Sequence, residues 1–215
     1  MPNWCYNDIR FYSDKSEVAK LKYYHHFLSK WLFNNSIFPD ARHNWYGNAL
    51  YGAGIIIDDN QKVDFPCRGF AECISDVEED GDKRVFFSLT TETAWCPMNQ
   101  VWFELLKSLK LEDKIELAVF SEECGNEIYE IYDPDEIFFS EDIYVDGYGS
   151  DEIDALKEYT NKEDIIPALQ AFLETKETEF SKLCKLVEEF SEKKYNDGED
   201  VYLAIHEIKR ISEPY

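Results

Sequence analysis

Polar and apolar residues alternate over residues 4–12 in the pattern of a half-buried β-strand. From Val18 to Leu32 the period changes, and apolar residues recur every three or four positions, as on one face of a helix. Asp14 and Glu17 precede this segment with the spacing of a helix capping box. The chain is therefore expected to begin with a strand and continue into a helix.

Residues 34–66 lack a regular period and contain several glycine and proline breakers. A β-branched run at 55–57 predicts a strand there, so we interpret this segment as an insertion with its own small hairpin. Two longer strand-like runs follow at 68–77 and 84–91, and an Asp-Gly pair between them favours a tight turn. These two runs are expected to pair with each other.

A helical pattern introduced by Pro97 continues to about Leu111, and strand patterns recur at 114–120 and 126–132. This order of elements is that of a split β-α-β fold, with two helices on one face of an antiparallel sheet. We therefore predict an α+β protein in which residues 1–135 form a ferredoxin-like βαββαβ domain.

The pattern changes again in residues 136–215. Ser150 begins a short acidic helix, apolar residues spaced by four and three predict a long helix over 164–194, and a closing strand is expected at 201–211. We interpret this part as an acidic, mainly helical extension that packs on the first domain. Because Lys176 interrupts the apolar seam of the long helix, we expect a monomer or a weak dimer.

Charge narrows the classes of function. The 215 residues include 22 Lys and Arg against 45 Asp and Glu, which gives a net charge of −23. Residues 71–215 carry 14 basic and 38 acidic side chains, so the excess lies almost entirely after the first 70 residues. Such a chain lacks the positive field that attracts nucleic acids and anionic membranes, and a basic host or phage protein is the better candidate partner. With no basic leader, no long apolar run and no closely paired cysteines, we expect a cytoplasmic protein with reduced thiols.

Candidate chemistry is sparse. The histidines show no pattern that would activate a nucleophile, and neither a nucleophile elbow nor a phosphate-binding glycine loop occurs. The cysteines lack zinc-site spacing, and the acidic turns at 58–64 and 78–82 lack the loop of a calcium site. We therefore expect no metal and no cofactor, and we assign no catalytic residue. His43, inside the glycine-bearing insertion, is the one histidine in a plausible site loop.

Three motifs suggest a family. They are the opening Pro2-Asn3-Trp4-Cys5-Tyr6-Asn7, the segment Thr91-Glu92-Thr93-Ala94-Trp95-Cys96-Pro97, and the turn Glu122-Glu123-Cys124-Gly125-Asn126. Together they resemble the YubB-like ferredoxin-fold family of phage- and plasmid-borne proteins, over roughly residues 1–132. The resemblance implies a ferredoxin-like fold and a mobile-element setting. It transfers no catalytic residue, because the family carries no established activity.

The same motifs supply the candidate binding residues. Asn3, Trp4, Thr93 and Trp95 are expected at one end of the sheet, where they could form a pocket. Alternatively, the two tryptophans pack together and lock the sheet to the second helix. On this basis we expect a non-enzymatic protein-binding module. The alternatives are a small enzyme with its pocket at the Trp4 and Trp95 end, and a DNA-mimic inhibitor of a nucleic-acid-binding protein.

Overall fold

The computed structural model describes residues 3–34, 44–56 and 63–213. The chain divides into two compact units, which are Met1–Phe139 with Arg210–Tyr215 (unit 1) and Ser140–Lys209 (unit 2). Each unit has its own apolar core. The predicted boundary after residue 135 lies a few residues before the observed one, and the last residues of the chain return to unit 1.

The sheet of unit 1 has the strand order β2-β4-β1-β5-β6-β9, with the short β3 also paired to β4. Strand bounds are β1 Trp4–Asp14, β2 Gly69–Ile74, β3 Glu78–Asp80, β4 Arg84–Ala94, β5 Glu116–Glu123, β6 Ile128–Tyr132 and β9 Lys209–Arg210. Strand β1 lies between β4 and β5 and is antiparallel to both. The predicted pairing of 68–77 with 84–91 is confirmed, since β2 and β3 both pair antiparallel with β4.

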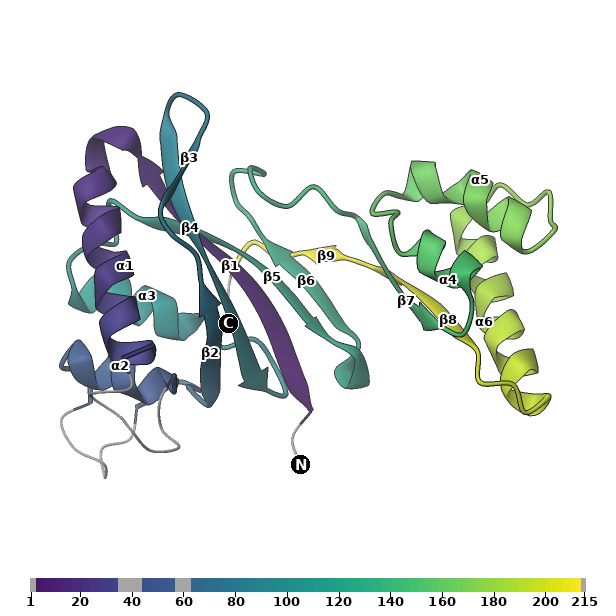
Figure 1. Ribbon diagram of the computed structural model, residues 1–215, viewed down its shortest axis with the longest axis horizontal. Coiled ribbons are helices and arrows are strands. Elements are labelled where there is room, and N and C mark those ends of the chain that lie inside the picture. The colour runs from purple at the N-terminus through teal and green to yellow at the C-terminus, as the bar shows by residue number, and fades with distance from the viewer. Residues whose placement is uncertain (1–2, 35–43, 57–62, 214–215) are drawn as a thin grey trace. The chain divides into compact units, whose positions relative to one another are not determined.

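Three helices cover one face of this sheet: α1 (Val18–Leu32), α2 (Tyr46–Gly52) and α3 (Gln100–Ser108) (Figure 1). The predicted alternation of residues 4–12 is present in β1, and the side that carries Cys5, Asn7, Ile9 and Phe11 is the buried one. Phe11 is central to the core, and its ring contacts the rings of Tyr24, Phe87 and Trp102. Burial of these large side chains between the sheet and the helices is the main source of the stability of unit 1.

The prediction of a hairpin within residues 34–66 is wrong for the part that the structure describes. Helix α2 occupies this segment, and Ile55 and Ile56 lie outside any strand, while Ile57 falls outside the described residues. Gly54 adopts a positive φ of 72°, and the backbone N–H of Ile55 donates to the carbonyl of Leu50. This is the Schellman arrangement that ends a helix, in which an apolar residue after the glycine packs back onto the core.

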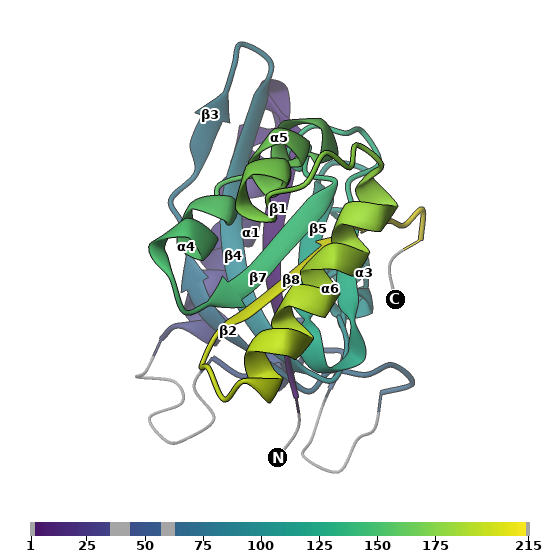
Figure 2. The same cartoon turned by 90° about the vertical axis from the view of Figure 1, so that its right-hand side faces the viewer.

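Unit 2 consists of a two-stranded antiparallel sheet and three helices. Their bounds are β7 Ile143–Tyr148, β8 Tyr202–Glu207, α4 Asp151–Leu156, α5 Lys162–Phe172 and α6 Phe180–Asn196. Ser150 caps α4 as predicted, because its hydroxyl accepts a hydrogen bond from the backbone N–H of Ile153. Helix α6 runs alongside β8 (Figure 2) and contributes Leu183 and Val187 to the core of the unit.

The prediction of one long helix over 164–194 is also wrong, because residues 173–179 separate α5 from α6. Glu174 adopts a positive φ of 50°, and the N–H of Thr175 donates to the carbonyl of Gln170. The Glu177 carboxylate then accepts hydrogen bonds from the backbone N–H groups of Thr178 and Glu179. These local bonds satisfy the backbone groups that a continuous helix would otherwise use.

The prediction of an α+β protein is confirmed, with a mainly antiparallel sheet and six α-helices in the described residues. Within the same residues, every helix is too short or too polar to cross a membrane.

Candidate functional site

Four of the five predicted site residues lie at the end of the sheet where β1 begins and β4 finishes. The carbonyl oxygen of Asn3 accepts a 2.8 Å hydrogen bond from the backbone N–H of Trp95. The Trp4 ring packs edge-on against Phe70, with centroids 5.9 Å apart, and the Arg68 guanidinium lies 5.3 Å from the centre of the Trp95 ring. Trp4 is 39% exposed and Trp95 is 50% exposed. The two tryptophans thus have different partners, and this geometry gives no support to a Trp4–Trp95 lock between the sheet and the second helix.

Thr93 lies on the opposite face of the sheet from Trp4. It pairs with Cys5 across β1 and β4, is 1% exposed, and donates from its hydroxyl to the carbonyl of Cys96 at 2.8 Å. The structure therefore brings the predicted residues to one end of the sheet without making their side chains converge. His43 lies outside the described residues.

Near this end of the sheet, Asn7 of the opening motif is the centre of a buried polar cluster. The Asn7 side-chain amide donates to the hydroxyls of Thr91 and Thr93, at 3.3 and 3.1 Å, and the Ser121 hydroxyl donates to Asn7 Oδ1 at 2.8 Å. These groups come from β1, β4 and β5, so one asparagine links three strands. Burial raises the pKa of the neighbouring Cys5 thiol to about 12, which keeps it protonated and unreactive near neutral pH. The cluster is a structural device of the sheet.

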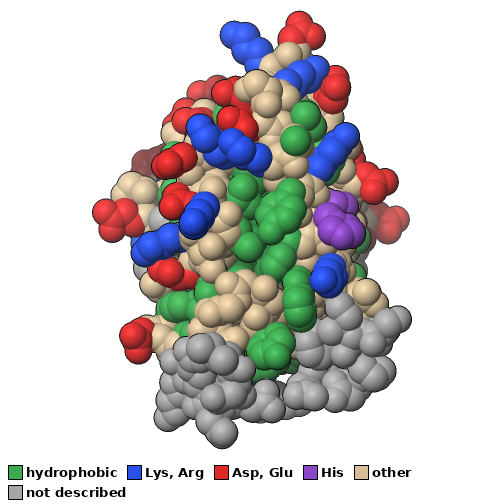
Figure 3. All heavy atoms as spheres, turned by 90° about the vertical axis from the view of Figure 1, so that its left-hand side faces the viewer, with side chains coloured by type: hydrophobic (Ala, Val, Ile, Leu, Met, Phe, Trp, Pro, Cys, Tyr) green, Lys and Arg blue, Asp and Glu red, His purple; other side chains and the backbone are tan. Residues whose placement is uncertain are grey.

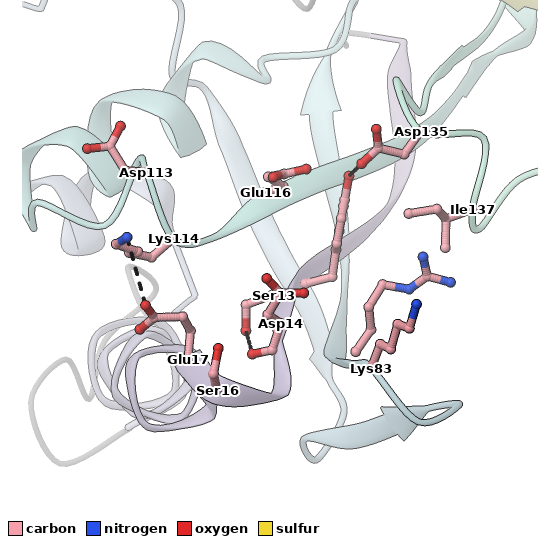
Figure 4. A pocket seen from close by; sticks show the side chains of 12 residues that line it. Ser13, Asp14, Ser16, Glu17, Lys83, Asp113, Lys114, Glu116, Asp135 and Ile137 are labelled. Carbon is pink, nitrogen blue, oxygen red and sulfur yellow. Dashed lines mark hydrogen bonds and ion pairs between the residues drawn. The ribbon is translucent and has the colours of Figure 1, made fainter.

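An open site lies at the other end of β1, where a cleft of about 320 Å³ opens within unit 1. The Tyr12 hydroxyl donates a 3.0 Å hydrogen bond to Asp135 Oδ2, and Glu116 is the cross-strand partner of Tyr12 on β5. Figure 4 shows the side chains of Lys114 and Asp135 on either side of Glu116. Five carboxylates and three cationic side chains line the cleft, so acceptors outnumber cations.

The turn after β6 positions Asp135. The Asp133 carboxylate accepts hydrogen bonds from the backbone N–H groups of Phe138 and Phe139, at 2.7 and 3.0 Å. The Phe138 ring in turn packs against the Tyr12 ring, with centroids 5.1 Å apart. The loop that carries Asp135 is therefore tied to the sheet on both sides of that residue.

Tyr12 is held protonated. Its pKa is raised far above the usual range, first by burial and then by hydrogen bonding and repulsion from Glu116 and Asp135. Such a hydroxyl keeps its proton near neutral pH, so it stays a hydrogen-bond donor and is a poor base or nucleophile. The arrangement is thus suited to binding rather than to proton abstraction by this tyrosine.

A second, more apolar cavity of about 210 Å³ adjoins the cleft, because Glu116 lines both. Phe103, Leu106 and Tyr132 contribute to its wall. Burial raises the pKa of Tyr132, and the negative charges of Glu116 and Asp135 raise it further. An aliphatic chain that ends in a positive charge would match this pair of cavities.

No sequence pattern predicts the cleft. Tyr12 and Asp135 are 123 residues apart, and neither belongs to a recognisable motif. The pairing of β1 with β5 could have indicated part of the cleft, because the antiparallel register of these strands places Glu116 beside Tyr12.

Residues 3–34, 44–56 and 63–213 contain no group of three or more His, Cys, Asp or Glu side chains that could hold a metal ion. Comparison with protein-family models, with curated proteins and with solved structures finds no match.

Proposed function

We propose that the chain is a non-enzymatic binding module whose partner is a basic protein. The observation that carries this proposal is the cleft in which Glu116 and Asp135 flank the protonated hydroxyl of Tyr12. A lysine or arginine side chain of a partner would place its charge between the two carboxylates. Its methylene stem would contact the apolar wall of the adjoining cavity.

The charge of the chain supports the same partner class. A net charge of −23 accelerates encounter with a positively charged protein and makes the association sensitive to salt. Many described carboxylates are already paired with lysine or arginine, as Glu79 is with Lys15 and Asp80 with Arg84.

In the cleft, Glu17 is likewise paired with Lys20 and Lys114. Glu116 and Asp135 are in no ion pair among the described residues, although Asp135 accepts the Tyr12 hydrogen bond. These two carboxylates are therefore better placed to contact a new cation than the paired ones.

An enzyme at the Trp4 and Trp95 end receives less support, because the side chains there do not converge on a common point. A DNA-mimic inhibitor stays the alternative among binding functions. Competition between duplex DNA and this protein for a purified DNA-binding protein would distinguish that alternative from the proposed one.

We also propose that unit 1 is a ferredoxin-like domain related to the YubB-like proteins, in a cytoplasmic mobile-element setting. The strand order β2-β4-β1-β5, with α1 and α3 on one face, supports the ferredoxin-like part. A monomer or weak dimer remains our expectation for the assembly.

The proposed function is tested with a fluorescent lysine-rich peptide as the probe. Wild type should bind it, and binding should weaken steeply as salt is raised from about 0.05 to about 0.5 M. The double variant Glu116→Gln/Asp135→Asn should bind about tenfold more weakly at low salt. Both carboxylates are exposed, so the fold should tolerate the change.

The matched control is Glu188→Gln/Glu189→Gln, which removes the same charge from exposed positions on α6. Its affinity for the peptide should fall only slightly, by the general effect of a lower net negative charge. Equal losses in the two double variants would show that the cleft has no special role. Salt-independent binding, or no binding at all, would overturn the proposal.

A further inference from the structure

The helices of unit 1 have a charge opposite to that of the whole chain. Helices α1, α2 and α3 together contain four lysines and one glutamate, Glu104, whereas the chain carries −23. Helix α1 has no acidic residue in its 15 positions. These three helices are thus net basic within a strongly acidic protein.

Aromatic side chains follow the same layer. Tyr23, Phe27 and Trp31 are spaced by four along α1 and so lie on one side of that helix. The rings of Phe27 and Trp31 are 6.5 Å apart, and the Trp31 ring meets Tyr51 of α2 edge-on at 6.1 Å. We call these four residues the aromatic strip. Tyr23 is 53% exposed and Tyr51 is 52% exposed, so both ends of the strip are open to solvent.

A basic row runs beside the strip. Lys22, His26 and Lys30 are also spaced by four on α1 and are exposed, and Lys30 Nζ lies 5.3 Å from the centre of the Trp31 ring. Figure 3 shows an apolar band through the middle of this face, with lysine and arginine side chains on both sides of it and aspartate and glutamate side chains towards the edges. From Lys22 to Lys30 the row is about 12 Å long, at 1.5 Å per residue, which matches two turns of a helix.

We infer that the aromatic strip and its basic row bind an acidic amphipathic helix of another protein. The apolar side of such a helix would cover Tyr23 and Tyr51, and its carboxylates would lie along the lysines. Charge complementarity selects this occupant, since the row is positive while the rest of this chain repels acidic surfaces.

Nucleic acid fits the strip less well, because base stacking needs ring faces that are free. Phe27 is 7% exposed, and a Cβ at Gly52 would lie 2.4 Å from the Trp31 ring, so both rings are packed into the helical layer. This inferred contact is separate from the proposed binding of a basic protein. Its test uses an acidic peptide, whereas the test of the proposed function uses a lysine-rich one, so the failure of one proposal leaves the other intact.

The test uses a synthetic acidic peptide in which leucine and glutamate repeat with helical spacing. Titration into the full chain, followed by tryptophan fluorescence and calorimetry, should show saturable binding that weakens with salt. Lys22→Glu/Lys30→Glu should reduce the affinity at least about tenfold, and Tyr51→Ser should reduce it by a smaller factor. All three positions are exposed, and circular dichroism would verify that the variants remain folded.

The matched control is Lys176→Glu/Lys185→Glu, which makes the same charge change at exposed positions of unit 2. It should bind the peptide nearly as wild type does. A single-stranded oligonucleotide and phosphatidylglycerol vesicles are run in parallel, with sedimentation to detect self-association. Equal effects of the two double variants, an absence of peptide binding, or preferential binding of the oligonucleotide, the vesicle or a second copy would each overturn the inference.

Discussion

Asn7 on β1 accepts a 2.8 Å hydrogen bond from Ser121 on β5 and donates one of 3.1 Å to Thr93 on β4. All three side chains are at most 2% exposed, so water cannot replace a bond that is lost. In the low dielectric of the core, a fully satisfied network of this kind fixes the register of the strands that it joins. Because these side chains share their hydrogen bonds, the loss of one deprives another of a hydrogen bond in the core.

Replacement of Asn7 by alanine should therefore destabilise unit 1 by about 2–4 kcal/mol, because several buried polar groups lose their partner at once. Urea unfolding followed by tryptophan fluorescence measures the change. Asn126→Ala provides the control, since Asn126 is exposed and donates one side-chain hydrogen bond to the carbonyl of Trp95. It should cost less than about 1 kcal/mol. Similar costs for both variants would show that the cluster does not stabilise the sheet as we describe.

Much of the central sheet could be predicted, because its signal is local. The alternation of residues 4–12 grouped Cys5, Asn7, Ile9 and Phe11 on one side of a strand, and the structure shows that this side is buried. The candidate site could not be predicted in the same way. Tyr12 and Asp135 meet through the fold, and nothing near either residue in the sequence marks that contact.

Both errors occur at a helix end where a residue in the left-handed conformation stops the helix. Gly54 ends α2, and Ile55 then returns to the core where a strand was expected. In α5 the corresponding left-handed residue is Glu174. A glutamate gives no signal for a helix end, and so the apolar spacing predicted that the helix would continue.

Glu174 leads to a second prediction. Its side chain is exposed, but its φ of 50° lies in the left-handed region that disfavours residues with a Cβ. Glu174→Gly should stabilise unit 2 by about 0.5–1 kcal/mol, whereas Glu174→Ala should bring no such gain. Thermal unfolding of the two variants against wild type provides the measurement. If glycine stabilised no more than alanine, the left-handed helix end would be wrong.

A third prediction concerns the pH dependence of stability. Burial raises the pKa of Cys5 from 9.0 to about 12, so the unfolded chain loses this proton at a lower pH than the folded chain does. The contribution of Cys5 is complete below pH 9 and is lost as pH rises from 9 towards 12, by up to about 1.4 kcal/mol per pH unit. Cys5→Ala should remove the Cys5 share of this slope and leave the share of Cys67, Cys96 and Cys184, whose pKa values burial also raises. The variant also lowers stability at neutral pH through the cavity that it leaves. Urea titrations of both proteins between pH 8 and 10 measure the difference in slope, because the tyrosines, which ionise at about pH 10, contribute equally to both proteins. Parallel curves would contradict the assignment.

Thiol reactivity gives an independent readout of the same residue. Cys73 and Cys124 are exposed, and neither they nor Cys5 form a disulfide. A thiol reagent at pH 8 should therefore label Cys73 and Cys124 in the native protein and reach Cys5 only after unfolding. Mass spectrometry of digested samples locates the label. Rapid native labelling of Cys5 would show that its burial is incomplete.

The last prediction separates the two readings of the motif around Trp95. This tryptophan combines a φ of 69° with 50% exposure, so its side chain contributes little burial while its backbone adopts a conformation that favours glycine. Trp95→Gly should change the free energy of unfolding by less than about 1 kcal/mol, because relief of backbone strain offsets the lost contact with Arg68. Trp102→Ala is the comparison, since Trp102 is fully buried against Phe11 and Tyr46 and should cost about 3–5 kcal/mol. Urea unfolding measures both changes. A cost for Trp95→Gly as large as that for Trp102→Ala would revive the structural lock, whereas a near-neutral change would leave the exposed indole available for binding.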